Sequence, residues 1–284
     1  MKMKNKFSFD IKTTAFFTKI IFKNIKTYIF VHFLSLVSFF ALFYIWNANT
    51  YEMLLPPIFI NFMLTSILFA PVYLALTINE WKKKNLLIKF KVGSLNKVNL
   101  FVAVFTITFL FIISSFLVNL IGYNIVLWSK LLSINFPLLT NIHWTLWIVL
   151  LFNIALLSVF ISAMILVLTC VSKKTVLNLL VIQLVFLFLV IFSDAFANPA
   201  FTNEKLIFVI FGYINPYKYF IWTNMLISSY QFADKFGMTQ IIPKYFNGNF
   251  APFSSIGITI SLTIVFTILV VVLYKYTFRF GVKK

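Results

Sequence analysis

The sequence predicts an all-α membrane protein whose helices cross the lipid bilayer several times. Of its 284 residues, 62% are hydrophobic and only 11% are charged, whereas a soluble domain carries roughly a quarter charged residues. A hydrocarbon core about 30 Å thick takes about 20 helical residues to cross. Several stretches exceed that length without one Asp, Glu, Lys or Arg, so we expect them to lie in the membrane.

Apolar runs bounded by charged or turn residues predict six transmembrane helices in one membrane domain, residues 1–284. The predicted spans are 28–46, 56–78, 100–127, 144–171, 176–192 and 256–274. No internal repeat and no low-complexity linker divides the chain.

The lysines indicate which ends of these helices face the cytoplasm. With the N-terminus inside, segments 1–27, 79–99, 172–175 and 275–284 hold 19 of the 24 Lys and Arg residues. Because cytoplasmic loops are enriched in Lys and Arg, we expect a multi-pass protein of the plasma membrane with both termini cytoplasmic. Attraction to anionic lipid headgroups accounts for the net charge of +18, so no nucleic-acid partner is expected.

Segment 1–27 contains a predicted amphipathic helix. Four lysines share a narrow arc at 100° per residue: Lys12, Lys19, Lys23 and Lys26. Four largely apolar residues fall opposite: Thr14, Phe17, Ile21 and Ile25. Such a helix lies in the membrane interface or presents its lysines to a cytoplasmic partner. A solvated basic leader is the alternative.

Segment 79–99 is predicted to be a cytoplasmic loop that combines charge with an apolar patch. Glu80 and a lysine cluster precede Leu86, Leu87 and Ile88, and a break follows at Gly93 and Ser94. An apolar patch between charges favours a short helix lying against another surface. Two interpretations of this loop are equally open. It is a docking site for a cytoplasmic protein, or it is a lysine cluster that only sets topology, beside an interfacial helix.

The predicted outer segment 194–255 is far longer than the other outer connections. Its apolar parts, 206–214 and 219–227, are too short to cross and are interrupted by Asn215 and Pro216. We therefore expect re-entrant or interfacial helices before the last span. Four aromatic side chains are expected at headgroup level: Tyr213, Tyr217, Tyr219 and Trp222.

No set of residues for catalysis, metal binding or a cofactor emerges. The chain has one cysteine, two histidines and six carboxylates, and none of them forms a zinc-binding, paired-carboxylate or Ser/His/Asp pattern. Amide side chains within the spans are expected to hydrogen-bond helix to helix rather than bind substrate. They are Asn61, Asn119, Asn153, Asn178 and Gln183.

Two segments carry a resemblance to a known family. Glu80, Trp81, Lys82, Lys83, Lys84, Leu86 and Leu87 stand between the second and third spans, and Tyr213, Asn215, Pro216 and Tyr217 stand before the last. The first set resembles the ATPase-coupling segment, and the second the outer Asn-Pro stretch, of ABC-2 type transporter permeases. As architecture the resemblance covers nearly the whole chain.

The resemblance implies the transmembrane permease subunit of an ATP-driven exporter, acting as a dimer with itself or a related permease. A separate ATPase subunit would bind the coupling segment, and the chain itself has no G-x-x-x-x-G-K-[ST] phosphate loop. We therefore expect no enzyme and no cofactor. The alternatives are a non-transporting assembly or immunity protein, and an intramembrane lipid-modifying enzyme that depends on His32 or Asp194.

Overall fold

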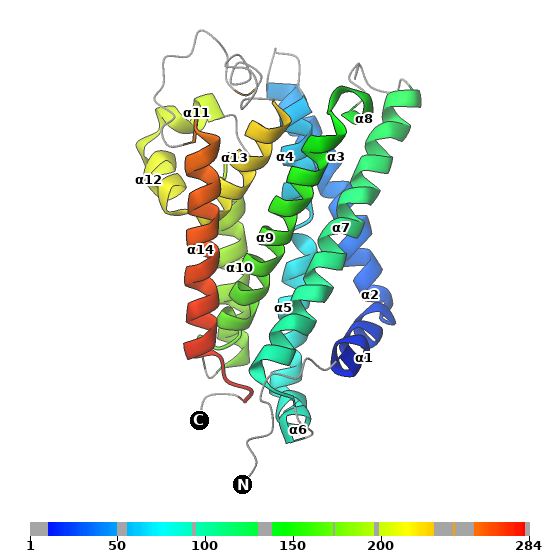
Figure 1. Cartoon of the computed structure of the whole chain (residues 1–284), viewed down its shortest axis with the longest axis vertical. Helices are drawn as coiled ribbons and strands as arrows, with labels where there is room; N and C mark the ends of the chain where they lie inside the picture. Colours follow the sequence, from blue (N-terminus) through cyan, green and yellow to red (C-terminus); the bar gives the residue numbers. More distant parts are fainter. Residues whose placement is uncertain are drawn as a thin grey trace.

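The computed structural model describes residues 11–49, 56–92, 95–129, 138–172, 174–195, 199–229, 241 and 253–281, and every regular element in these ranges is a helix. The prediction of an all-α protein is therefore confirmed for the described residues. Figure 1 shows one bundle of long helices. We call the end that carries α6 the basic end, because Lys83, Lys84, Lys89 and Lys91 are exposed there, and the opposite end the far end.

The helices follow one another along the chain without a strand among the described residues. The first half consists of α1 (Ile11–Phe22), α2 (Ile25–Tyr28), the π-helix η1 (Ile29–Phe33), α3 (Leu34–Asn49), α4 (Pro56–Ser66), α5 (Phe69–Lys83), α6 (Leu86–Val92) and α7 (Lys97–Ser129). The second half consists of α8 (Leu138–Asn141), α9 (Trp144–Leu168), α10 (Thr175–Ile191), α11 (Pro199–Glu204), α12 (Leu206–Ile214), α13 (Pro216–Ser228) and α14 (Ile256–Thr277).

Within the part of the chain that the structure describes, five helical stretches are long and apolar enough to cross a membrane. They are Ile25–Ile45, Pro57–Lys83, Lys97–Ser129, Trp144–Leu168 and Ile256–Thr277. The remaining predicted span, 176–192, corresponds to α10, whose 17 residues cover about 25 Å at 1.5 Å per residue. Five of the six predicted spans thus have helices of sufficient length, and the six-span count stays a prediction.

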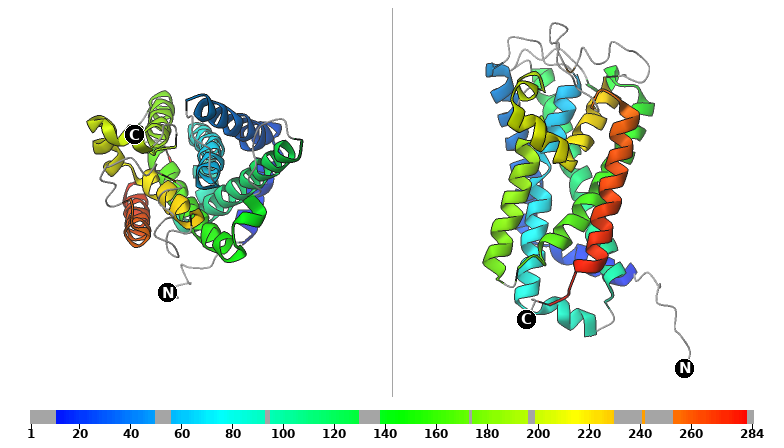
Figure 2. Two further views of the ribbon diagram at one scale, coloured as in Figure 1. Left: turned by 90° about the horizontal axis from the view of Figure 1, so that it is seen from above. Right: turned by 90° about the vertical axis from the view of Figure 1, so that its left-hand side faces the viewer.

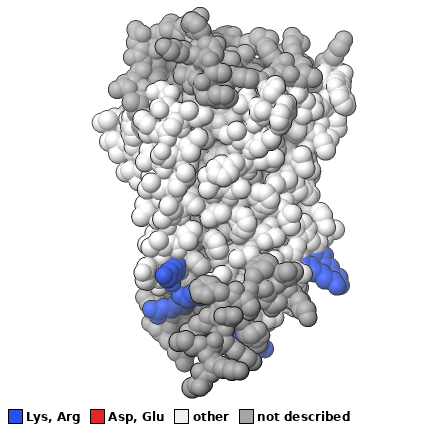
Figure 3. Space-filling view, viewed as in Figure 1, with Lys and Arg blue, Asp and Glu red and all other residues white. Residues whose placement is uncertain are grey.

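The bundle is apolar outside as well as inside. Large side chains such as Ile121, Phe152, Leu184 and Ile268 are exposed in the middle of four helices. On the face drawn in Figure 3, the described lysines gather near the basic end, and an uncharged surface covers most of the length of the bundle. A monomeric soluble protein rarely exposes so broad an apolar surface, so this surface fits contact with lipid.

The N-terminal helix lies across the basic end, below the long helices (Figure 1). In α1, Thr14, Phe17 and Ile21 are buried and Lys19 is exposed, as the predicted amphipathic pattern requires. The pattern ends at Phe22, because the chain turns there and Asn24 caps the next helix, α2. Ile25, predicted on the buried side, is 75% exposed.

Amide side chains join the helices, as predicted. Asn119 on α7 donates to the hydroxyl of Ser35 on α3 at 3.0 Å, and Asn153 on α9 donates to the carbonyl of Phe220 on α13 at 3.1 Å. The π-helix η1 is held in a similar way, since the Ser115 hydroxyl donates to the carbonyl of Val31 at 2.5 Å. These bonds satisfy polar groups that lipid could not.

Short helices occupy residues 199–228 of the predicted outer segment, where the sequence predicts short apolar helices. α12 begins and ends at the residues expected for the first apolar piece, and α13 extends the second by three residues at its start. Residues 230–240 and 242–252 of the predicted outer segment, residues 1–10 of the N-terminal segment and the predicted break at Gly93 and Ser94 lie outside the described residues.

Short as it is, α13 is a core helix. All residues from Tyr217 to Ser228 are buried, and the helix packs against α4, α9 and α14. Seen from above in Figure 2, α13 lies among the long helices rather than at their edge. Tyr217 and Trp222, which were predicted at headgroup level, are fully enclosed by protein, and their depth in the membrane stays a prediction.

Candidate functional site

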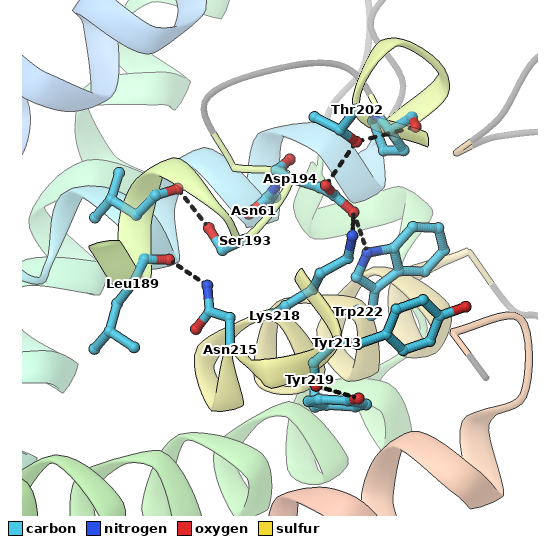
Figure 4. Close-up of polar contacts among 12 residues, drawn as sticks. Asn61, Leu189, Ser193, Asp194, Thr202, Tyr213, Asn215, Lys218, Tyr219 and Trp222 are labelled. Carbon is cyan, nitrogen blue, oxygen red and sulfur yellow. Dashed lines mark hydrogen bonds and ion pairs between the residues drawn. The ribbon is translucent and has the colours of Figure 1, made fainter. Parts of the chain in front are cut away.

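A buried ion pair organises the far end of the bundle. Asp194, just after α10, places its Oδ2 2.8 Å from the ammonium nitrogen of Lys218 on α13, and both side chains are almost inaccessible to solvent. The same oxygen accepts a hydrogen bond from the indole Nε1 of Trp222 at 2.7 Å, and Oδ1 accepts one from Thr202 at 2.7 Å. Figure 4 shows these three partners converging on the carboxylate.

The backbone at Asp194 is fixed as firmly as its side chain. Its φ of 61° lies in the left-handed region, which aspartate tolerates better than most residues. The main-chain carbonyl of Asp194 accepts a hydrogen bond from the Asn61 side chain on α4 at 3.2 Å. The end of α10 is thus bound to α4, α11 and α13.

The Asn215–Pro216 pair forms the joint between α12 and α13. Asn215 caps α13, because its side-chain oxygen accepts from the backbone N–H of Tyr217 at 3.0 Å, while Pro216 at the first helical position has no N–H to satisfy. The amide nitrogen of Asn215 donates to the carbonyl of Leu189 on α10 at 2.9 Å. The predicted motif therefore has a definite structural task, which is to fix the start of α13 against α10.

The aromatic members of this motif occupy two different environments. Tyr217 is fully buried and donates to the carbonyl of Leu64 on α4 at 2.9 Å. Tyr213 is 40% exposed, and its carbonyl accepts a hydrogen bond from the Tyr219 hydroxyl at 2.9 Å. Of the two, only Tyr213 has the partial exposure that a headgroup-level position requires.

The far-end cluster joins helices through the Asp194 carboxylate. Both of its oxygens are engaged by protein donors, namely Lys218, Trp222 and Thr202. His32, the other residue considered for lipid chemistry, lies half-buried near Tyr28 at a ring distance of 6.0 Å. Among the described residues, no group of three His, Cys, Asp or Glu side chains could hold a metal ion.

The predicted coupling residues form a corner at the basic end, where α5 meets α6. The chain turns at Asn85, whose φ is 55°, a value asparagine accommodates readily. Glu80, Lys83 and Lys84 are exposed there, whereas Trp81 and Leu86 are half-buried. Lys82 and Leu87 are buried, so these two predicted site residues face the protein interior.

The corner is supported by α1. Phe17 packs between Trp81 on α5 and Phe90 on α6, with ring centroids 5.2 Å apart in both cases. A buried aromatic pair contributes roughly 0.5–1.5 kcal/mol beyond the area it buries. The described part of the N-terminal segment is therefore a packed helix rather than a solvated leader, and it braces the corner from the side.

An apolar groove of about 380 Å³ lies between α3, the α4–α5 junction and α10. Its lining includes Leu42 on α3, Phe69 on α5 and Phe186 on α10. The hydroxyl of Thr65, also in the wall, donates to the carbonyl of Asn61 at 2.9 Å and so offers little polarity to the groove. Gln183 is the exception, an exposed amide in the middle of α10.

Sequence reasoning missed the pairing of Asp194 with Lys218. Both residues were expected in the predicted outer segment 194–255, and no contact between them was predicted. A signal was present, because Lys218 lies within an otherwise apolar and aromatic stretch, and a lysine in such a setting usually requires a partner. The chain matches no family model, no curated protein and no solved structure.

Proposed function

We propose that this protein is the transmembrane permease subunit of an ATP-driven exporter of the ABC-2 type. In this proposal six helices span the plasma membrane, with α10 as the fifth span. The basic end faces the cytoplasm, α12 and α13 form the re-entrant outer element, and a separate ATPase subunit binds the α5–α6 corner.

The observation that carries the proposal is that α5 belongs to both the corner and the groove. Phe69 and Val72 at one end of α5 line the groove, and Glu80 and Lys83 at the other end are exposed at the corner. The helix of 15 residues is about 22 Å long and contains no break. Because a helix transmits displacement along its axis, a push on the corner would move the groove wall.

The groove supports a substrate that is apolar at least in part. Its walls come from α3, α5 and α10, and the side chains in them are mostly aliphatic or aromatic. Pockets that bury apolar ligands have this kind of lining. A lipid tail or a hydrophobic segment of a larger molecule would lose little free energy on moving from the bilayer into the groove.

Gln183 supports the dimer. This amide is exposed in the middle of a helix whose neighbours Leu184 and Leu187 face outward. An amide in hydrocarbon is costly without a hydrogen-bond partner, and glutamine side chains commonly join transmembrane helices. A second copy that places its own Gln183 opposite would satisfy both side chains beside the groove.

The test is binding and stimulation of a phosphate-loop ATPase encoded by a neighbouring gene. The two proteins are co-purified in a mild detergent, and ATP hydrolysis is measured with and without the permease. Replacing Glu80, Lys83 and Lys84 together by serine should abolish co-purification and stimulation. These three are chosen because Trp81 and Lys82 also serve the fold.

The matched control replaces Lys19 on α1 and Lys23 directly after it, which are exposed at the same end, and it should leave binding unchanged. Unaltered binding by the corner variant would refute the coupling assignment. A protein that co-purifies with no ATPase from its own cells would refute the transport proposal and favour an assembly or immunity role.

A further inference from the structure

A polar cavity of about 280 Å³ opens at the basic end, and it is separate from the groove. Four helix ends meet around it, namely the last residues of α5 and α9, the first turn of α10 and the segment after α14. Small-molecule sites usually have volumes of roughly 300–1,000 Å³, so this cavity is suited to a compact group. None of the described residues that line it is a carboxylate.

Lys82 lies in the wall of this cavity and is only 2% exposed. Its ammonium donates to the carbonyl of Thr169 at 3.1 Å, lies 2.6 Å from the sulfur of Cys170 and sits 4.6 Å above the Phe278 ring. An ammonium has three N–H donors, and among the described residues only the Thr169 carbonyl and the Cys170 sulfur accept from that of Lys82. One donor is therefore left for a ligand.

The two buried lysines of the described chain differ in one respect. Lys218 has the carboxylate of Asp194 at 2.8 Å, whereas no described carboxylate lies within ion-pairing distance of Lys82. A buried charge without a counter-charge is costly. The α9 C-terminus beside Lys82 offers about half an elementary negative charge, which offsets only part of that cost.

Arg279 brings a second basic residue to the rim of the same cavity, where its backbone N–H and carbonyl both contact the Cys170 sulfur. It is the only arginine among the 24 basic residues of the chain, and it is exposed where the segment after α14 passes Cys170. A guanidinium binds phosphate oxygens in pairs, and an ammonium acts on them as a point charge. Two basic residues, Lys82 and Arg279, thus line one cavity.

The wall of the cavity is held in place before any ligand binds. Asn178 on α10 donates to the carbonyls of Thr169 and Ser172 at 3.2 and 3.1 Å, and it accepts from the Ser172 N–H at 2.7 Å. The connection between α9 and α10 is thereby fixed around Lys82. Fixed walls reduce the ordering cost of binding.

We propose that this cavity binds a phosphate group through Lys82 and Arg279. The group belongs either to an anionic lipid headgroup at the membrane surface or to a free phosphate compound in the aqueous phase. The proposal does not depend on transport or on an ATPase, so it can hold or fail independently of the function proposed above.

Cys170 provides the test, because it is the only cysteine of the chain and lines the cavity. The rate of its alkylation by N-ethylmaleimide is measured in a neutral detergent with inorganic phosphate or with chloride at equal ionic strength. The same rate is measured in phosphatidylcholine vesicles with and without phosphatidylglycerol. Bound phosphate should slow alkylation roughly tenfold at ten times the dissociation constant, since it leaves little of the cavity free.

Protection by inorganic phosphate supports a free phosphate ligand, and protection by phosphatidylglycerol alone supports a lipid headgroup. The variants Lys82→Met and Arg279→Gln should lose the protection. Arg279→Gln keeps the test valid if Lys82→Met does not fold, because Arg279 is exposed. A control with Cys170→Ala and Ala15→Cys, which moves the thiol to the exposed face of α1, should show no protection.

Two outcomes would overturn the proposal. One is an alkylation rate that neither phosphate nor phosphatidylglycerol changes. The other is equal protection in the parent protein and in both variants, which would mean that the anion acts elsewhere.

Discussion

The carboxylate of Asp194 and the ammonium of Lys218 form an ion pair 2.8 Å long inside the far end of the bundle. Removing one partner of a buried pair typically costs about 3–5 kcal/mol, whereas replacing both costs much less. We expect Asp194→Asn to destabilise the protein more than Lys218→Met. In Lys218→Met the Asp194 carboxylate keeps its hydrogen bonds from Trp222 and Thr202.

The measurement for this pair is unfolding by sodium dodecyl sulfate in mixed micelles, with helix content as the signal. The double variant Asp194→Asn/Lys218→Met should be more stable than Asp194→Asn alone. Additive losses in the double variant would mean that the two side chains do not interact.

Gly212 should tolerate no side chain. A Cβ added there would meet the Lys218 ammonium nitrogen at 2.9 Å and its Cδ at 3.1 Å, and Lys218 cannot withdraw without leaving Asp194. Overpacking of this kind costs about 1–3 kcal/mol. Gly257→Ala on α14 is the control, because nothing lies within 4 Å of the added carbon and alanine favours a helix by up to about 1 kcal/mol. Equal thermal stability of the two variants would contradict the packing around Lys218.

Phe17→Ala should release α1 from the α5–α6 corner. Loss of a buried phenylalanine side chain costs about 3–5 kcal/mol, and Phe17 contacts both Trp81 and Phe90. We expect trypsin to cut at Lys19 and Lys23 faster than in the parent protein. Ile25→Ala, at a position 75% exposed, should leave the cleavage rate unchanged, and a parent-like rate for Phe17→Ala would show that α1 is held in another way.

The orientation in the membrane can be read from two introduced cysteines in a Cys170→Ala background. Lys84→Cys lies at the basic end and Ser129→Cys at the far end, and both positions are exposed. A maleimide that cannot cross membranes should label position 129 in intact cells and position 84 only after permeabilisation, because lysine-rich ends stay in the cytoplasm. The reverse pattern would place the corner outside the cell and remove any contact with a cytoplasmic ATPase.

Gln183→Leu should weaken self-association without unfolding the protein. Interhelical hydrogen bonds in membranes contribute roughly 0.6–2 kcal/mol, so energy transfer between labelled copies in vesicles should fall several-fold at equal protein density. Leu184→Ala, on the adjacent exposed position, is the control. Unchanged energy transfer for Gln183→Leu would mean that Gln183 does not lie in a dimer interface beside the groove.

Local features of the fold could be predicted from the sequence because local sequence decides them. The apolar run of α12 and its end at Asn215 follow from composition and from the capping chemistry of asparagine before proline. The buried side of α1 follows from helical periodicity, up to the turn at Asn24. The sequence does not reveal that turn in advance, because its asparagine cap is compatible with a continuing helix as well.

The candidate sites depend on contacts between residues far apart in the chain, and one sequence does not supply these. Lys82 lies in a lysine cluster, and only the approach of Thr169 from α9 distinguishes it from Lys83 and Lys84. Tyr217 has the composition of an interfacial aromatic, but its hydroxyl reaches Leu64 on α4 and so it is enclosed. Amphipathic side chains suit both settings, and the packing of the helices decides between them.

The complete burial of α13 bears on where a solute could travel. This short helix is packed among α4, α9 and α14, so protein side chains fill the space between these helices in a single copy. For the export proposed above, we expect the substrate to pass along the outer surface of each copy. A second copy of the protein would cover that surface. Single copies, isolated one to a nanodisc, would then be impermeable even with the ATPase bound.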